Sequence, residues 1–127
     1  MVKFAHIALW TRDIDRICAF WERIFDAEIE PLYESRNRLG FSSRFLSLKA
    51  GGIIEVMSGP WVADHQDDEH IGYAHIAISV GSRDAVDQLA WKMEKEGVLV
   101  AAPRLTGDGF YEAVIKDHDG NLIEVTA

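Results

Sequence analysis

The tetrapeptide Ala5-His6-Ile7-Ala8 recurs as Ala74-His75-Ile76-Ala77, and this repeat decides the fold. The tripeptide Ile-Glu-Val at residues 54–56 likewise recurs at residues 123–125. Both second copies stand 69 positions after the first, from 6 to 75 and from 55 to 124, so one gapless shift superimposes them. Two copies of so long a unit indicate two half-domains rather than a solenoid. Each half therefore carries one histidine and one glutamate at equivalent positions.

The hydrophobic pattern predicts the order β-α-β-β-β in each half, which is an α+β fold. First strands are expected at residues 4–10 and 73–80, each followed by a helix with apolar residues at helical spacing, from Ile14 to Phe25 and from Val86 to Met93. Three short strands follow in each half, near 28–33, 43–49 and 52–58, and near 98–102, 111–116 and 121–126. The polar, acidic residues 59–71 are expected to link the first unit, 1–58, to the second, 72–127.

Length, charge and cysteine usage narrow the class of protein. The 127 residues suit one domain with a substantial core, and the net charge of −8 argues against a surface for nucleic-acid phosphates or anionic lipid. No apolar stretch approaches the roughly 18 residues of a membrane span, and no signal-peptide pattern stands at the start. The only cysteine, Cys18, excludes an internal disulfide and suits a reducing cytosol. We expect a cytoplasmic protein that does not bind nucleic acid or membrane.

Strand parity places the repeated histidines and glutamates on one kind of face. Side chains alternate along a strand, so all four lie opposite a purely aliphatic row that is expected to pack on the helices. A carboxylate among apolar strand residues needs a partner or a metal. Each residue taken singly could instead be a solvated residue on an alternating strand. Their duplicated register favours a metal site formed by His6, Glu55, His75 and Glu124.

Imidazole and carboxylate ligands suit zinc, nickel, cobalt, manganese or iron(II) rather than copper(I). No thiolate accompanies them, which argues against a structural zinc cluster. Four protein ligands on an octahedral ion leave two positions for water or substrate, and such an ion can act as a Lewis acid on a carbonyl. Oxygen chemistry at iron(II) more often uses two histidines and one carboxylate. The fourth ligand therefore favours proton transfer, with a glutamate as general base.

The sequence resembles the vicinal oxygen chelate superfamily, which includes glyoxalase I, extradiol dioxygenases, fosfomycin-resistance proteins and bleomycin-binding proteins. The resemblance covers nearly the whole chain. It rests on five segments: His6–Trp10, Phe20-Trp21-Glu22 with Phe25, Ile54–Val56, His75–Val80 and Asp117–Glu124. It implies paired βαβββ units that form a cupped mixed sheet around the metal.

Within that superfamily the order His, Glu, His, Glu is similar to glyoxalase I, which isomerises the hemithioacetal of methylglyoxal and glutathione. The resemblance implies that His6, Glu55, His75 and Glu124 bind a divalent ion, with nickel, zinc or cobalt ahead of manganese or iron. It implies Glu124 as the proton-shuttling base and Glu55 as its symmetric partner. It also implies a small-molecule substrate and a homodimer, with the site inside one chain or shared by two.

Two positions depart from the glyoxalase I pattern. Bacterial members usually have an arginine four residues after the first histidine, where it holds the glutathione carboxylate, and this chain has Trp10. An asparagine expected after the first glutamate is replaced around Ser58-Gly59. Metal chemistry therefore carries over better than glutathione recognition. The loop arginines Arg36, Arg38 and Arg44 could meet an anionic substrate or simply be exposed.

Two other functions stay open at this stage. An extradiol-type dioxygenase would hold iron(II) and consume oxygen with a catechol. A non-catalytic, bleomycin-type binding or resistance protein would keep its ligand after the metal is removed and would turn nothing over.

Overall fold

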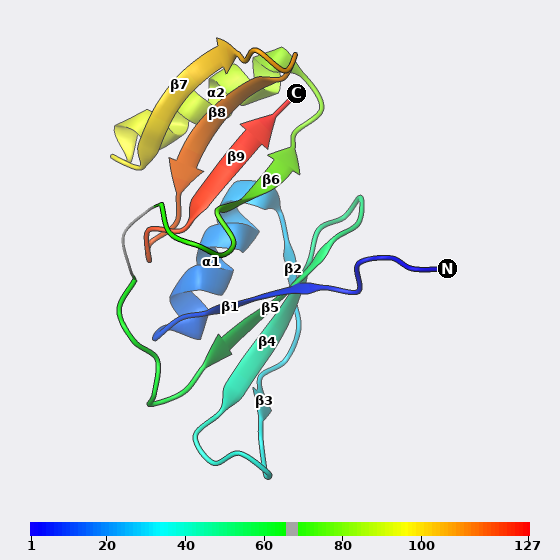
Figure 1. Ribbon diagram of the computed structural model, residues 1–127, viewed down its shortest axis with the longest axis vertical. Helices are drawn as coiled ribbons and strands as arrows, with labels where there is room; N and C mark the ends of the chain where they lie inside the picture. Colours follow the sequence, from blue (N-terminus) through cyan, green and yellow to red (C-terminus); the bar gives the residue numbers. More distant parts are fainter. Residues whose placement is uncertain (66–68) are drawn as a thin grey trace. The chain divides into compact units, whose positions relative to one another are not determined.

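Both halves of the chain fold as a helix packed on a mixed sheet, as the repeat predicts (Figure 1). The computed structural model describes residues 1–65 and 69–127, and residues 66–68 of the predicted linker lie outside the described residues. The chain divides into two units, Met1–Asp64 and His65–Ala127, and the boundary falls within that linker. No helix in the described residues has the length and apolar character needed to cross a membrane.

The first unit contains one helix and five strands in two layers. Strand β1 pairs in parallel with β5, and β5 pairs antiparallel with β4, which also pairs with β2 and β3. The elements are β1 (Ile7–Trp10), α1 (Ile14–Phe25), β2 (Glu28–Ile29), β3 (Tyr33–Glu34), β4 (Ser42–Ser47) and β5 (Ile53–Ser58).

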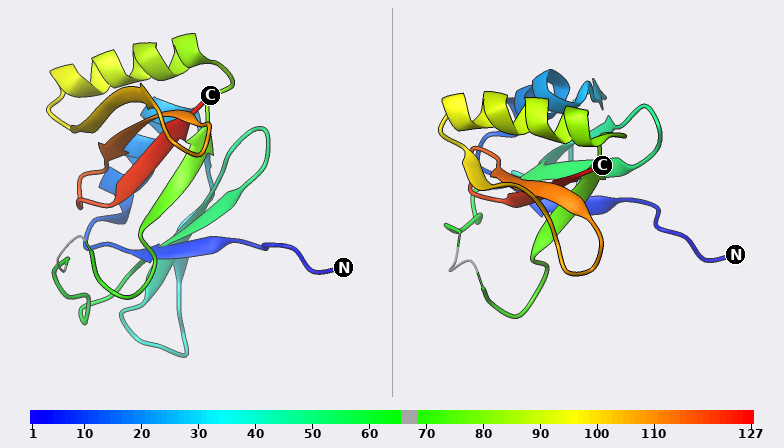
Figure 2. Two further views of the ribbon diagram at one scale, coloured as in Figure 1. Left: turned by 45° about the horizontal axis from the view of Figure 1, so that its top comes forward. Right: turned by 90° about the horizontal axis from the view of Figure 1, so that it is seen from above.

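The second unit repeats this arrangement without the extra short strand. Strand β6 pairs in parallel with β9, and the antiparallel pairs β9–β8 and β8–β7 complete the sheet. Helix α2 packs along one face of β7, β8 and β9 (Figure 2). The elements are β6 (His75–Ser79), α2 (Arg83–Lys95), β7 (Leu99–Leu105), β8 (Tyr111–Lys116) and β9 (Leu122–Thr126).

Local sequence accounts for where the helices begin and end. The carboxylate of Asp13 accepts a hydrogen bond from the backbone N–H of Arg16 at 3.0 Å, and the hydroxyl of Ser82 accepts one from Ala85 N–H at 3.1 Å. Both are N-caps, which satisfy a backbone donor that the first helical turn leaves free. Gly97 follows the second helix with φ +76°, a conformation that glycine adopts without steric cost.

The predicted strand boundaries need correction at two places in the first unit. Strand β1 begins at Ile7 rather than at residue 4, so His6 directly precedes it. The single strand expected at residues 28–33 is two separate strands, β2 and β3, which both pair with β4. Pro31 stands between them, and proline supplies no N–H to a ladder, so continuous pairing is broken there. In the second unit β7 continues beyond residue 102 to Leu105, with two register shifts against β8.

The aliphatic rows of β5 and β9 are buried in the core, as predicted. Ile54, Val56, Ile123 and Val125 are all buried, under α1 in the first unit and α2 in the second. The rows of β1 and β6 are less covered: Leu9, Ile76 and Ile78 are partly exposed, and Ile7 has 44% of its surface exposed. Helix α1 packs on β4, β5 and β2, so the edge strand β1 keeps part of its aliphatic side uncovered.

A tight turn centred on Asp117 joins β8 to β9. Asp117 is buried, and its carboxylate accepts hydrogen bonds from the backbone N–H groups of Asp119 and Asn121 and from the Asn121 side chain, all at 2.9 Å. Gly120 has φ +86°, a conformation that glycine adopts without steric cost in an Asp-Gly hairpin turn. Burial raises the pKa of Asp117, while these hydrogen bonds act in the opposite direction. The turn fixes the register in which β9 presents Glu124.

We predict that Asp117→Ala lowers the free energy of unfolding by about 2 kcal/mol, because three donors lose a charged acceptor in a buried turn. Urea denaturation of the metal-free protein measures the change. Lys116→Ala, at the exposed neighbouring position, is the matched control and should stay within about 0.5 kcal/mol of the parent. An Asp117→Ala variant as stable as this control would contradict the role assigned to the turn.

Candidate metal centre

The structure brings together the first predicted pair of ligands, His6 and Glu55. Nε2 of His6 lies 3.4 Å from Oε1 of Glu55. The parallel register of β1 on β5 sets Ala8 opposite Glu55. The small side chain of Ala8 thus stands between those of His6 and Trp10 on this face. The ring of Phe45, which is opposite Glu55 on β4, meets the His6 imidazole edge-on with centroids 5.3 Å apart.

The second unit repeats this geometry with His75 and Glu124. Their Nε2 and Oε1 atoms are 3.1 Å apart, and Ala77 lies opposite Glu124 in the β6–β9 register. The exposed fractions also correspond, at 40% and 18% for His6 and Glu55 and 37% and 23% for His75 and Glu124. Each glutamate is thus held in a partly covered position beside a more exposed imidazole.

The separation within each pair fits two neighbouring ligands of one ion. Zinc, for example, binds imidazole nitrogen and carboxylate oxygen at about 2.0–2.2 Å, so two ligands at a right angle stand about 3 Å apart. The measured 3.4 and 3.1 Å are close to that value. The same distances also suit an ion pair of a protonated imidazole with a carboxylate. Within neither unit, among its described residues, are three or more His, Cys, Asp or Glu side chains placed to hold a metal ion together, so each unit assembles two of the four predicted ligands.

Glu112 is a residue of the second site that sequence reasoning missed. It stands on β8 opposite Thr126 of β9, on the same strand face as Glu124, and only 7% of its surface is exposed. Burial, and then the nearby charge of Glu124, raise the pKa of Glu112. The repeat concealed it, because the shift by 69 pairs Glu112 with Ser43 rather than with an acid. A carboxylate within the apolar run of β8 was the available signal.

We predict that Glu112→Gln stabilises the metal-free protein near neutral pH, because the variant no longer holds two carboxylates side by side. A raised folded-state pKa means that this group favours folding most below its ordinary pKa, and that the contribution is lost as pH rises through the raised value. Urea unfolding between pH 4 and 8 should therefore show that the free energy of unfolding of the variant increases relative to that of the parent as pH rises. Glu94→Gln, an exposed glutamate of α2, is the control. A constant difference across that range would contradict the assignment.

The other residues considered from sequence divide into structural and exposed groups. Arg44 is structural, because its guanidinium contacts Asp15 of α1 at 3.3 Å and donates to the Glu30 carbonyl at 3.1 Å. Cys18 is buried, and burial raises the pKa of its thiol to about 11, so it is an unreactive core residue. Arg38 is exposed but stacks on Trp61, with the guanidinium carbon 3.8 Å from the ring centroid.

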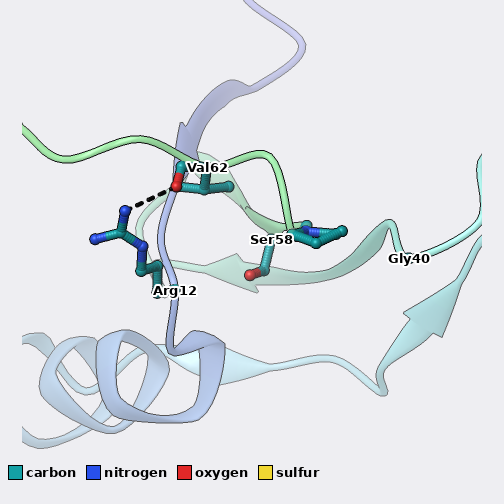
Figure 3. A pocket seen from close by; sticks show the side chains of 6 residues that line it. Arg12, Gly40, Ser58 and Val62 are labelled. Carbon is teal, nitrogen blue, oxygen red and sulfur yellow. Dashed lines mark hydrogen bonds between the residues drawn. The ribbon is translucent and has the colours of Figure 1, made fainter.

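A hollow of about 410 Å³ lies in the first unit at the ends of β1 and β5 (Figure 3). Arg12 stands at its side, and its guanidinium donates to the Val62 carbonyl at 3.0 Å and pairs with Asp64. Its lining residues are Arg12, Gly40, Ser58, Gly59, Pro60 and Val62. Neither His6 nor Glu55 lines it, so it is separate from the predicted ligands.

Comparison with known proteins is consistent with this architecture. The family model of the Glyoxalase/Bleomycin resistance protein/Dioxygenase superfamily matches residues 3–125. An uncharacterized protein of Pseudomonas aeruginosa, PA2024, is 30% identical over 126 residues, which cover 94% of this chain and 84% of that protein.

Solved structures share the fold. A glyoxylase/bleomycin resistance protein/dioxygenase domain from Frankia sp. EAN1pec has a TM-score of 0.84 at 20% identity, covering 99% of this chain and 97% of that one. A variant of glyoxalase I from Zea mays has a TM-score of 0.75 at 20% identity, with 95% of this chain matching 43% of that longer chain. A variant of the fosfomycin resistance protein FosX from Listeria monocytogenes, complexed with Mn(II) and 1S,2S-dihydroxypropylphosphonic acid, has a TM-score of 0.73 at 25% identity over 100% and 93% of the two chains.

Proposed function

The chain belongs to the Glyoxalase/Bleomycin resistance protein/Dioxygenase superfamily, and from that premise we propose that it is a metal-dependent lyase or isomerase of the glyoxalase I type. Its reaction moves a proton between carbons next to a carbonyl, in the hemithioacetal of methylglyoxal or a related small molecule. One observation carries the proposal. Each unit holds a histidine and a glutamate in the same register, with the two side chains 3.4 and 3.1 Å apart.

The proposed ligands are the two pairs acting together on one divalent ion, His6 with Glu55 and His75 with Glu124. Nitrogen and oxygen donors without sulfur fit nickel, zinc or cobalt, with manganese and iron(II) as alternatives. The Mn(II) in the FosX relative supports a divalent ion in a site of this fold. The protein is proposed to work as a homodimer.

In the proposed reaction the bound ion would polarise the substrate carbonyl and stabilise the negative charge that develops on it. Oε1 of Glu124 takes the proton from the carbon that carries sulfur and hydroxyl, and the same carboxyl returns it to the neighbouring carbon. His75, whose Nε2 is 3.1 Å from that oxygen, would be the neighbouring ligand of the ion. Glu55 is the equivalent carboxylate of the first unit and the second candidate for proton transfer.

Metal analysis tests the ligand set. We predict one divalent ion per chain, and we predict that His6→Ala and His75→Ala each weaken its binding by roughly 100-fold or more, since even residues that only orient ligands account for 10–100-fold. Titration calorimetry with elemental analysis measures both quantities. His65→Ala removes a histidine outside the four and is the control. Two ions per chain, or unchanged affinity after loss of one pair, would contradict a single shared ion.

Activity assays test the base. With methylglyoxal and a panel of thiols, Glu124→Gln is expected to lower kcat by about 10²–10⁴-fold, the usual contribution of general base catalysis. Circular dichroism and metal content show whether the variant is still folded and loaded, and Glu94→Gln is the control for loss of a distant carboxylate. Full turnover by a loaded Glu124→Gln variant would rule out this residue as the base.

Oxygen uptake with a catechol would instead identify a dioxygenase. Ligand binding that survives chelation without turnover would identify a binding protein.

A further inference from the structure

An aromatic cluster lies on the same face of the first sheet as the first predicted ligand pair. It consists of Trp10, Phe41 and Trp61, with Arg38 stacked against it. The ring of Trp10 meets Phe41 at 6.0 Å and Trp61 at 6.1 Å, both edge to face. Trp10 ends β1 and comes four residues after His6, which directly precedes that strand. The alternation of side chains therefore puts both on one face, at a separation of about 13 Å.

The residues between the His6–Glu55 pair and the aromatic cluster lie on the same face of the sheet. Ala8 and Met57 have the parity of His6 and Glu55, and Met57 is opposite Trp10 in the β1–β5 register. A molecule that reaches the His6–Glu55 pair along β1 therefore meets the aromatic cluster next. The Trp10 ring is available to such a molecule, because 42% of the residue stays exposed.

Close packing against glycine holds Trp61 in its place. A Cβ added at Gly59 would lie 2.3 Å from a carbon of the Trp61 ring, so only glycine allows the indole to lie against this backbone. Gly40 permits a similar approach, because its Cβ would lie 2.9 Å from the Pro60 ring. The indole therefore lies directly against the Gly59 backbone, while 38% of Trp61 stays exposed.

Arg38 uses this surface in a way that leaves its hydrogen-bond donors available. The guanidinium carbon is 3.8 Å from the centroid of Trp61 and 5.8 Å from that of Trp10. A guanidinium stacked through its flat face keeps its N–H groups directed outward in its own plane, where a carboxylate can accept two of them. Among the described residues, no carboxylate forms an ion pair with Arg38, although the chain has 21 acidic residues and 13 basic ones. Arg44, by contrast, is committed to Asp15.

We propose that Trp10, Trp61 and Arg38 form a recognition site for a planar aromatic group that carries a carboxylate, and that this group is the remote end of the substrate. The proposal rests on the proposed function in so far as the reacting end of that substrate lies at His6 and Glu55. The indole of Trp10 contacts the aromatic ring, and Arg38 binds the carboxylate. Bacterial members of the family that the sequence resembles usually have an arginine where this chain has Trp10. Here the Trp10 ring lies 5.8 Å from the guanidinium carbon of Arg38, which comes from another segment.

The test uses 2-naphthoate as the probe and 2-naphthalenemethanol as its neutral analogue, with the full chain in metal-loaded and metal-free forms. The change in tryptophan fluorescence or in heat measures each Kd. We expect naphthoate to bind at least ten-fold more tightly than the alcohol in both forms, because the site does not include the metal ligands. Equal binding of the two probes would overturn the proposal and leave only an apolar surface.

Three variants locate the effect. Arg38→Gln is expected to abolish the ten-fold preference, and Gly59→Ala is expected to reduce it by displacing Trp61 while every recognition group remains. Arg36→Gln, which removes a neighbouring loop arginine, should leave the preference within two-fold. Arg38→Lys serves if the glutamine variant does not fold, since it keeps the charge but loses the two-pronged contact, and it should retain less than half of the preference. A preference that persists in both Arg38 variants would overturn the assignment.

These measurements separate this proposal from the proposed function. Naphthoate binding that depends on Arg38, in a protein without turnover, would support the recognition site and rule out the proposed lyase reaction. Turnover of the methylglyoxal hemithioacetal, together with naphthoate binding that ignores Arg38, would do the reverse.

Discussion

The parallel pairing of the first and last strands of each unit is the constraint on which the candidate site depends. In the first unit it places Ala8 opposite Glu55, and in the second Ala77 opposite Glu124. A slip of one residue would turn both glutamates toward the helix and bury a carboxylate among aliphatic side chains. The buried Val56 and Val125, next to the two glutamates, secure the register, since they reach the core only when the glutamates face away from it.

This dependence explains how much could be predicted from the sequence. The repeat and strand parity were sufficient for the order of elements and for the closeness of each histidine to its glutamate. These features depend on local periodicity and on a strand register that occurs in both halves of the repeat. The division into β2 and β3 was missed, although Pro31 is visible in the sequence, because an interrupted strand and a continuous one have the same alternation.

The features that sequence reasoning missed arise from contacts between segments that the repeat does not relate. Glu112 reaches the neighbourhood of Glu124 through the β8–β9 register, and its equivalent in the first unit is Ser43. Arg38 was one of three loop arginines of equal standing, until packing showed that Arg44 is paired with Asp15 and Arg38 is stacked on Trp61. A sequence records which residues are charged, but the partner of a charge depends on how loops close.

The two units therefore share one pair of side chains and differ around it. The equivalents of Trp10 and Arg38 in the second unit are Ser79 and Gly107, so the aromatic cluster has no counterpart there. The equivalent of Glu112 in the first unit is a serine, so the paired carboxylates have no counterpart in the first unit. The histidine–glutamate pair is the part of this face that the repeat has in both units. Around that pair the first unit has aromatic and cationic groups, and the second unit has a buried carboxylate, Glu112, close to Glu124. Each unit can differ at these positions without moving its own histidine or glutamate, because the register of its first and last strands fixes that pair.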